Sequence, residues 1–216
     1  MKSRTRKAAP IRTAPEIETK DAPKRILDAA SDLFAKQGYS KTTMSEIADR
    51  ACVSKGLPYV YFPSKHELLD AVQLRAINNW YAETEKHLQI GEEPPIESLK
   101  KGFKYSILYS ARDPICRAIM AQDPKLLLPN SEKLRAEIVR MNDEGFTRLF
   151  EELRKRRIIR IDIPLTDILT IWRITHDSLI HIHTDTFSWG STNRALGDLI
   201  DSALEVLLGG LLVKEA

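Results

Sequence analysis

The segment from Lys55 to Tyr61 gathers side chains that suit contact with a polyanion. Lys55 supplies a cation, Gly56 permits close approach of another molecule, and Tyr59 and Tyr61 supply two phenols. The charge distribution favours the same partner, because residues 1–66 carry 13 Lys+Arg against 7 Asp+Glu, whereas residues 67–216 carry 20 against 23. The first part of the chain is therefore expected to meet a polyanion, and a chance imbalance between solvated faces is the alternative.

Three histidines, His176, His181 and His183, form the other group with possible chemistry. On a helix, positions i and i+2 point about 200° apart, so an H-x-H pair cannot chelate one metal there. His176 and His183 share a face, but two turns separate them. We therefore expect no metal, no cofactor and no catalytic residue, and a metal-dependent hydrolase using the histidines and Asp177 is disfavoured. The histidines are interpreted as polar lining of a pocket or dimer interface, or as ordinary packed or exposed residues.

Two helices precede the Lys55–Tyr61 segment. A 3.6-residue apolar period begins at Asp21 and stops at Gly38, where a glycine can end a helix. The residues of its apolar face are Ile26, Leu27, Ala30, Leu33 and Phe34. Thr43 and Glu46 have the spacing of a capping box, which predicts the start of a second, short helix.

A third helix is expected over the segment itself. Ser54 is placed to cap it, and Pro63 ends it. Ser64 and Glu67 form a second capping box that opens a long helix through Trp80. Three short helices with a three-to-four-residue turn between the second and third predict a DNA-binding helix-turn-helix.

The rest of the chain is expected to be helical as well. A Gly- and Pro-containing break at residues 91–95 is followed by helical patterns, and no segment alternates with period two. The expected helices cover residues 96–111, 114–122, 131–157, 165–187 and 192–212. The predicted fold class is all-α, with a three-helix helix-turn-helix followed by a helical C-terminal domain.

More than a dozen N-terminal positions resemble, in register and without a gap, the DNA-binding domain of the tetracycline-repressor (TetR) family. They include Ile26–Ala30, Leu33–Phe34, Gly38–Tyr39, Thr42–Thr43, Ile47–Ala48, Val53–Gly56, Tyr59, Tyr61–Phe62 and Lys65. The resemblance covers roughly residues 22–70. It implies a homodimer, an all-helical effector domain and repression that a ligand relieves.

The resemblance also implies the DNA contacts. The implied phosphate contacts are Thr43, Tyr59, Tyr61 and Lys65, and the implied groove-facing residues are Lys55, Gly56, Leu57 and Val60. Core packing is the alternative for the two tyrosines, and Phe62 is expected in the core. Two residues depart from the family. Cys52 stands where glycine is usual, so the turn must accept a side chain, and Pro58 implies that the recognition helix starts later or as a tighter turn.

The last predicted helix carries an apolar stripe that is wider than docking to one neighbour requires. Together with the preceding helix it fits a four-helix bundle across a two-fold axis, and the candidates for that dimer interface are Leu199, Leu204 and Leu207. A purely intramolecular core is the alternative.

The middle helices hold side chains of the kind that line apolar pockets. The candidates for effector binding are Phe103, Tyr105, Tyr109, Met120, Met141 and Trp172, with His176 as a possible polar contact. Each could equally be simple core, and the expectation of a cavity rests mainly on the family resemblance.

We therefore expect three parts: a disordered basic arm over residues 1–20, the helix-turn-helix domain over 21–66, and the effector-binding and dimerisation domain over 67–216. Cys52 and Cys116 fall in apolar helical patterns and are expected to be packed, reduced thiols. Neither a transmembrane stretch nor a secretory signal is expected, which predicts a cytoplasmic protein.

These observations predict a DNA-binding transcriptional regulator rather than an enzyme. A repressor is favoured over an activator. We expect it to bind a palindromic operator as a homodimer and to be released by a small, mostly apolar effector. An architectural DNA-binding protein without an effector is the remaining rival, which the long C-terminal part disfavours.

Overall fold

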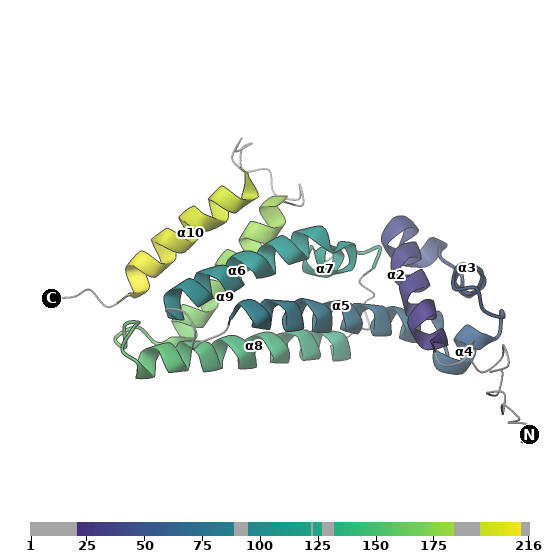
Figure 1. Ribbon diagram of the computed structural model, residues 1–216, viewed down its shortest axis with the longest axis horizontal. Helices are drawn as coiled ribbons and strands as arrows, with labels where there is room; N and C mark the ends of the chain where they lie inside the picture. Colours follow the sequence, from purple (N-terminus) through teal and green to yellow (C-terminus); the bar gives the residue numbers. More distant parts are fainter. Residues whose placement is uncertain (1–20, 89–94, 122, 127–131, 184–194, 213–216) are drawn as a thin grey trace, which may run out of the picture. The chain divides into compact units, whose positions relative to one another are not determined.

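The computed structural model describes residues 21–88, 95–121, 123–126, 132–183 and 195–212, and helices make up most of these ranges (Figure 1). The helices are α2 (Ala22–Lys41), α3 (Met44–Arg50), α4 (Leu57–Tyr61), α5 (Lys65–His87), α6 (Pro95–Arg112), α7 (Pro114–Met120), α8 (Glu132–Lys155), α9 (Leu165–His183) and α10 (Leu196–Leu211). The described residues contain no strand, only an isolated antiparallel bridge between Ile159 and Leu212. The predicted all-α fold is confirmed, and the predicted arm at residues 1–20 lies outside the described residues.

The chain forms two compact units, Met1–Leu69 and Asp70–Ala216. In the first unit, α2 buries the apolar face that its sequence period predicts, and α3 buries one face as well. The fully buried members are Ile26, Ala30 and Phe34 on α2 and Ile47 and Ala48 on α3. Gly38 takes a φ of 80°, which interrupts the regular helix where the sequence predicts its end. Burial of large apolar side chains, at about 1.5–3 kcal/mol each, holds this small unit together.

The second unit contains most of α5 and all of α6 to α10. Its apolar core is formed by α6, α8, α9 and α10. Its fully buried side chains include Leu99, Phe103 and Ile107 on α6, Phe150 and Leu153 on α8, and Ile200 on α10. The predicted helices at 96–111, 114–122 and 131–157 agree with α6, α7 and α8 to within a few residues. Segment 184–194, which includes the predicted end of one helix and start of the next, lies outside the described residues.

Local signals set the helix starts in this unit too. Asp113 caps α7, because its carboxylate accepts the backbone N–H of Cys116 at 2.8 Å. Pro114 follows at the first helical position, where a missing N–H costs nothing. Within the described part of the chain, no helix is both long and apolar enough to cross a bilayer.

Candidate DNA-binding surface and effector cavity

A reciprocal capping box fixes the start of α3. The Thr43 hydroxyl accepts the Glu46 N–H at 3.2 Å, and Glu46 Oε2 accepts the Thr43 N–H at 2.8 Å. The Thr43 hydroxyl also donates to Glu46 Oε2 at 2.8 Å. These donations from Thr43 lower the pKa of Glu46. The predicted capping box is confirmed, and it presents the exposed N-terminus of α3 to solvent, an arrangement that favours a phosphate.

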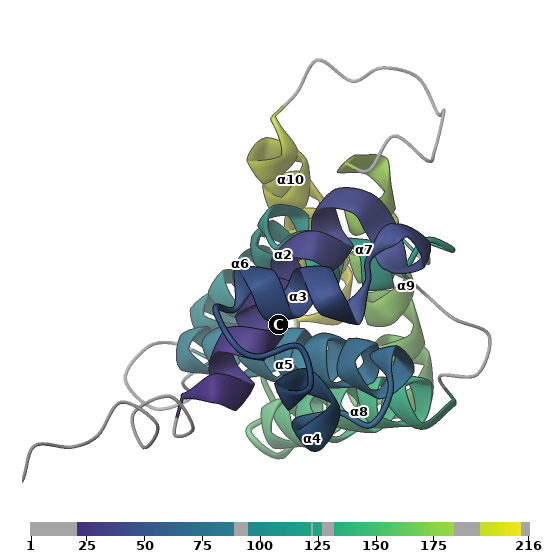
Figure 2. The same ribbon diagram turned by 90° about the vertical axis from the view of Figure 1, so that its right-hand side faces the viewer.

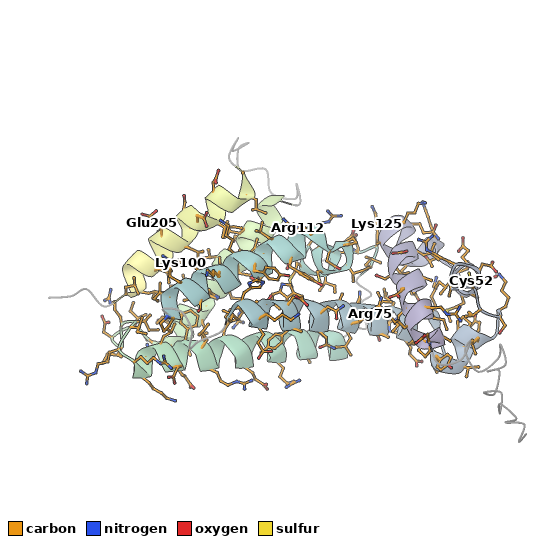
Figure 3. The ribbon with its side chains drawn as sticks, in the orientation of Figure 1. Cys52, Arg75, Lys100, Arg112, Lys125 and Glu205 are labelled. Carbon is orange, nitrogen blue, oxygen red and sulfur yellow. The ribbon has the colours of Figure 1, made fainter. Side chains whose placement is uncertain are left out.

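Cys52 ends α3 in a left-handed conformation, with φ of 54°. The Val53 N–H bonds to Ala48 O at 3.0 Å and the Cys52 N–H to Asp49 O at 3.1 Å, which is the pattern of a Schellman motif. Glycine is usual at this position because it has no Cβ to strain. Cys52 lies at the surface on this turn (Figure 3). The expectation of a packed thiol is therefore wrong for Cys52, whereas Cys116 is buried as expected.

Pro58 shifts the start of the recognition helix. α4 begins at Leu57 with Gly56 as its cap, and Ser54 is not the N-cap that the sequence suggested. The Leu57 N–H bonds to Ser54 O at 3.0 Å and the Tyr59 N–H to Gly56 O at 3.2 Å, so the chain enters α4 through tight turns. Pro58 occupies the first turn, where no N–H partner is needed, and its ring is buried. The later, tighter start expected from Pro58 is confirmed.

The face of α4 and its preceding turn is exposed and unusually apolar. Tyr59 is 53% exposed, Val60 73% and Tyr61 37%, which removes core packing as an account of the two tyrosines. Leu57 is half-buried. A Cβ added at Gly56 would meet nothing within 4 Å, and the φ of Gly56 is −83°, so nothing inside the described chain requires a glycine there.

The two candidate lysines differ in their surroundings. Lys55 is exposed; its ammonium forms an ion pair with Asp49 and donates to Ser45 O at 3.1 Å. Lys65 is partly buried and donates to two backbone carbonyls, Tyr39 O at 2.8 Å and Thr42 O at 2.9 Å.

The Lys65 ammonium also lies 4.1 Å from the centroid of the Tyr39 ring, a cation–π contact. Two of its three donors therefore hold the first residue of α5 against the end of α2, which the sequence did not indicate.

A cavity of about 250 Å³ lies between α5 and α8, and both views show these helices side by side (Figures 1 and 2). Its described walls include Tyr81, Thr84 and Leu88 from α5 and the segment after it, and Leu149 from α8. A smaller recess of about 30 Å³ is lined from α9. The side chains that line both spaces are Trp80 and Phe146.

The predicted effector residues divide into four groups. Trp172 and His176 line the recess. Phe103 is buried in the core and packs on both, with ring centroids 4.3 and 5.6 Å away. The residues that line neither described space are Tyr105, Tyr109 and Met120. Met141 lies on α8 among residues whose side chains the structure does not describe.

The sequence reasoning missed most of the α5 wall. Trp80, Tyr81 and Thr84 lie on the long helix predicted to begin at Ser64, and none of them was among the expected effector-binding residues. Thr84 lies about one turn after Trp80 and Tyr81, and Leu88 lies a further turn on, so the four residues share one broad face of the helix. That signal was present, but it does not distinguish a cavity wall from ordinary packing.

A buried polar network joins α5, α6 and α9 beside the recess. Trp80 Nε1 donates to Ser106 O at 2.9 Å, and the Ser106 hydroxyl donates to Phe103 O at 2.7 Å. His176 Nε2 lies 3.0 Å from Ser106 Oγ, within hydrogen-bond distance of that hydroxyl. The network fixes Trp80 relative to His176.

The described residues contain no group of three His, Cys, Asp or Glu side chains that could hold a metal ion. The side chains of His181 and His183 lie outside the described residues.

The candidate dimer residues are only partly accessible. Leu199 and Leu207 are half-buried, but Leu204 is 2% exposed and packs in the core of its own subunit. Leu204 therefore has no surface to offer a second subunit. The apolar stripe of α10 includes both core and surface positions, and the sequence pattern did not distinguish them. Exposed apolar side chains on these two helices include Ile171 and Ile174 on α9, at 49% and 60%, and Val206 on α10, at 78%. Glu205, beside Val206 in sequence, is labelled in Figure 3.

The N-terminal geometry defines a class of protein. Two helices followed by a tight turn and a short, exposed third helix form a helix-turn-helix of the DNA-binding type. Residues 26–72 match the family model described as bacterial regulatory proteins, tetR family. The match lies in the N-terminal part of the chain, which is therefore similar to the DNA-binding part of this family.

Curated relatives agree with this assignment. The chain is 43% identical over 65 residues to an uncharacterized HTH-type transcriptional regulator, YuxN, of Bacillus subtilis, covering 30% of this chain and 21% of that one. It is 41% identical over 71 residues to the HTH-type transcriptional repressor KstR of Mycobacterium tuberculosis, covering 33% and 32%. The chain thus matches about a fifth to a third of the length of these relatives, which are regulators rather than enzymes.

A solved structure extends the likeness in fold to the C-terminal unit. The transcriptional regulator FadR from Bacillus subtilis, in complex with stearoyl-CoA, has a TM-score of 0.70 at 20% sequence identity and covers 87% of this chain and 98% of its own. The two structures therefore share a helical fold over most of this chain.

Proposed function

We propose that this protein is a transcriptional repressor that binds a palindromic operator as a homodimer in the bacterial cytoplasm and is released by a small, mostly apolar effector. The proposal rests on the exposed face of α4, whose side chains do not pack in the core of their own unit. Val60 is 73% exposed although valine gains by burial, and the space beside Gly56 is open, so another molecule can approach the backbone closely there.

The proposed DNA contacts follow from this face. Thr43, at the N-terminus of α3, and the donors of Tyr59, Tyr61 and Lys65 are assigned to backbone phosphates. Lys55 and Gly56 precede α4 and are assigned, with Leu57 and Val60, to the groove; the two aliphatic side chains suit a thymine methyl. Lys55 reaches DNA only by leaving Asp49, an exchange that costs little because the exposed pair is worth about 0–1 kcal/mol.

The proposed dimer uses the outer faces of α9 and α10. Ile174 and Val206 are exposed there, and Leu199 and Leu207 remain half-buried beside them. Two α4 helices related by a two-fold axis would enter successive major grooves about 34–36 Å apart, which requires an inverted-repeat operator.

The proposed effector site is the cavity between α5 and α8. Its apolar lining, including Leu88, Phe146 and Leu149, suits an apolar ligand. The related fold of FadR holds a fatty acyl-CoA, which supports the same class here. α5 runs from Lys65 to His87, so a ligand that displaces Trp80 acts on the helix that begins beside α2. Full release requires about 5.5 kcal/mol of differential binding summed over the sites.

The test selects bound sequences from random DNA and measures their affinity by fluorescence anisotropy. We expect an inverted repeat, and Tyr59→Phe should lower the affinity about tenfold, because it removes one hydrogen bond to a charged phosphate. Tyr105→Phe, a matched change in the C-terminal unit, should leave the affinity unchanged. A protein that enriches no inverted repeat and responds alike to both changes is not the proposed regulator.

A further inference from the structure

Two residues that line these spaces each carry a buried polar atom with no hydrogen-bond partner among the described residues: Thr84 Oγ1 and Trp172 Nε1. The Thr84 side chain, 4% exposed, lines the 250 Å³ cavity, and Trp172, 2% exposed, lines the adjoining recess. Buried polar groups are nearly always paired, and an unpaired one costs free energy that a ligand can recover.

The two atoms differ in the hydrogen bonds that they can make with a ligand. A threonine hydroxyl donates or accepts, so Thr84 selects nothing, whereas an indole N–H only donates and requires an acceptor. The Trp172 ring cannot easily turn away, because Phe103 and Phe150 pack edge-on against it with centroids 4.3 and 5.2 Å away. The Trp80 N–H already donates to Ser106 O at 2.9 Å, so it requires no acceptor from a ligand.

The recess limits what can meet that N–H. Its volume of about 30 Å³ suits one small polar group, since about 10–15 Å³ of such space is enough to hold one water molecule. Arg173 and Asp177 in its wall carry opposite charges, so the recess has no excess charge that would favour an ion. The larger cavity beyond Trp80 and Phe146 would take the apolar remainder.

We propose that the effector is an apolar molecule whose uncharged carbonyl oxygen enters the recess and accepts a hydrogen bond from Trp172 Nε1. This assignment rests on the proposed effector role of the C-terminal unit. It places the specificity for the ligand's polar group on α9 and the shape of its apolar part on α5 and α8.

The test compares two ligands of the same shape, 2-acetylnaphthalene and 2-isopropenylnaphthalene, in which a carbonyl oxygen is replaced by a methylidene group. Calorimetric titration of the full chain should show about five- to tenfold tighter binding of the ketone, the range expected for one hydrogen bond to a buried donor. Trp172→Phe should abolish this preference. Thr84→Val, which removes the other unpaired atom, should preserve it.

A second measurement does not depend on any variant folding. The chain has three tryptophans, so its indole N–H groups give three resonances in ¹⁵N-labelled protein. The ketone should move the Trp172 resonance downfield and the alkene should not, while the Trp80 N–H, already bonded, reports only nearby changes. Equal affinities, absence of ketone binding at millimolar concentration, or a Trp172 resonance that ignores the ketone each overturn the assignment, and a recess that holds only water would give these results.

Failure of the proposed switch gives a different result. Operator affinity is measured with and without saturating ketone. A ketone that binds with the expected preference but leaves the operator complex intact overturns effector release and leaves the role of Trp172 standing.

Discussion

Replacing Lys65 by methionine tests two roles of this side chain: it holds the start of α5 against the end of α2, and it is proposed to contact a DNA phosphate. The ammonium donates to Tyr39 O and Thr42 O at 2.8 and 2.9 Å and contacts the Tyr39 ring at 4.1 Å. Two hydrogen bonds to a charged group contribute about 1.5 kcal/mol each, and the side-chain entropy of an ordered lysine offsets part of that sum. We expect Lys65→Met to weaken the contact between α2 and the start of α5 by about 2 kcal/mol.

The assay has two readouts on the full chain. Amide hydrogen exchange at the end of α2 and start of α3 should accelerate about 30-fold, the equivalent of 2 kcal/mol. The third donor of Lys65 is assigned to a phosphate, so the slope of log affinity against log salt should become shallower by about 0.9. Lys55→Met is the matched control. It should change the slope similarly but leave exchange nearly unchanged, because its ion pair with Asp49 is exposed.

Each readout can refute one half of the reasoning. Exchange that stays at the wild-type rate in Lys65→Met means that the two carbonyl contacts contribute nothing to the stability of this corner. An unchanged salt slope removes Lys65 from the phosphate contacts, even if affinity falls through loss of structure.

Three further predictions concern a cap, a turn and the dimer. Thr43→Ala should destabilise the N-terminal unit by about 1 kcal/mol in denaturant unfolding, and a variant as stable as wild type would show that the capping box is dispensable. Cys52→Gly should stabilise the same unit by about 1 kcal/mol, because it relieves the positive φ without removing core contacts; a loss of stability would contradict the strain. Val206→Glu should give folded monomers by light scattering, whereas Leu204→Glu should unfold the C-terminal unit, and a folded dimer of Val206→Glu would move the interface away from this face.

The sequence alone determined the local structure. Apolar periods and caps act over three or four residues, so the helices and the capping box of Thr43 could be predicted from neighbouring residues. The effect of Pro58 was also local, because a missing N–H forbids an early helix start regardless of the rest of the fold. The helix-turn-helix followed from the same information.

Only the tertiary structure decided which residues of each helix pack in the core, which lie at the surface and which line a cavity. A wide leucine stripe on α10 contains both core and surface, and only packing against α6 and α9 shows that Leu204 belongs to the core. Lys65 reaches Tyr39 across 26 residues of sequence, a contact that no local pattern encodes. The cavity between α5 and α8 depends on the space that two helices fail to fill, and residue type does not distinguish a side chain that lines such a space from one that fills it.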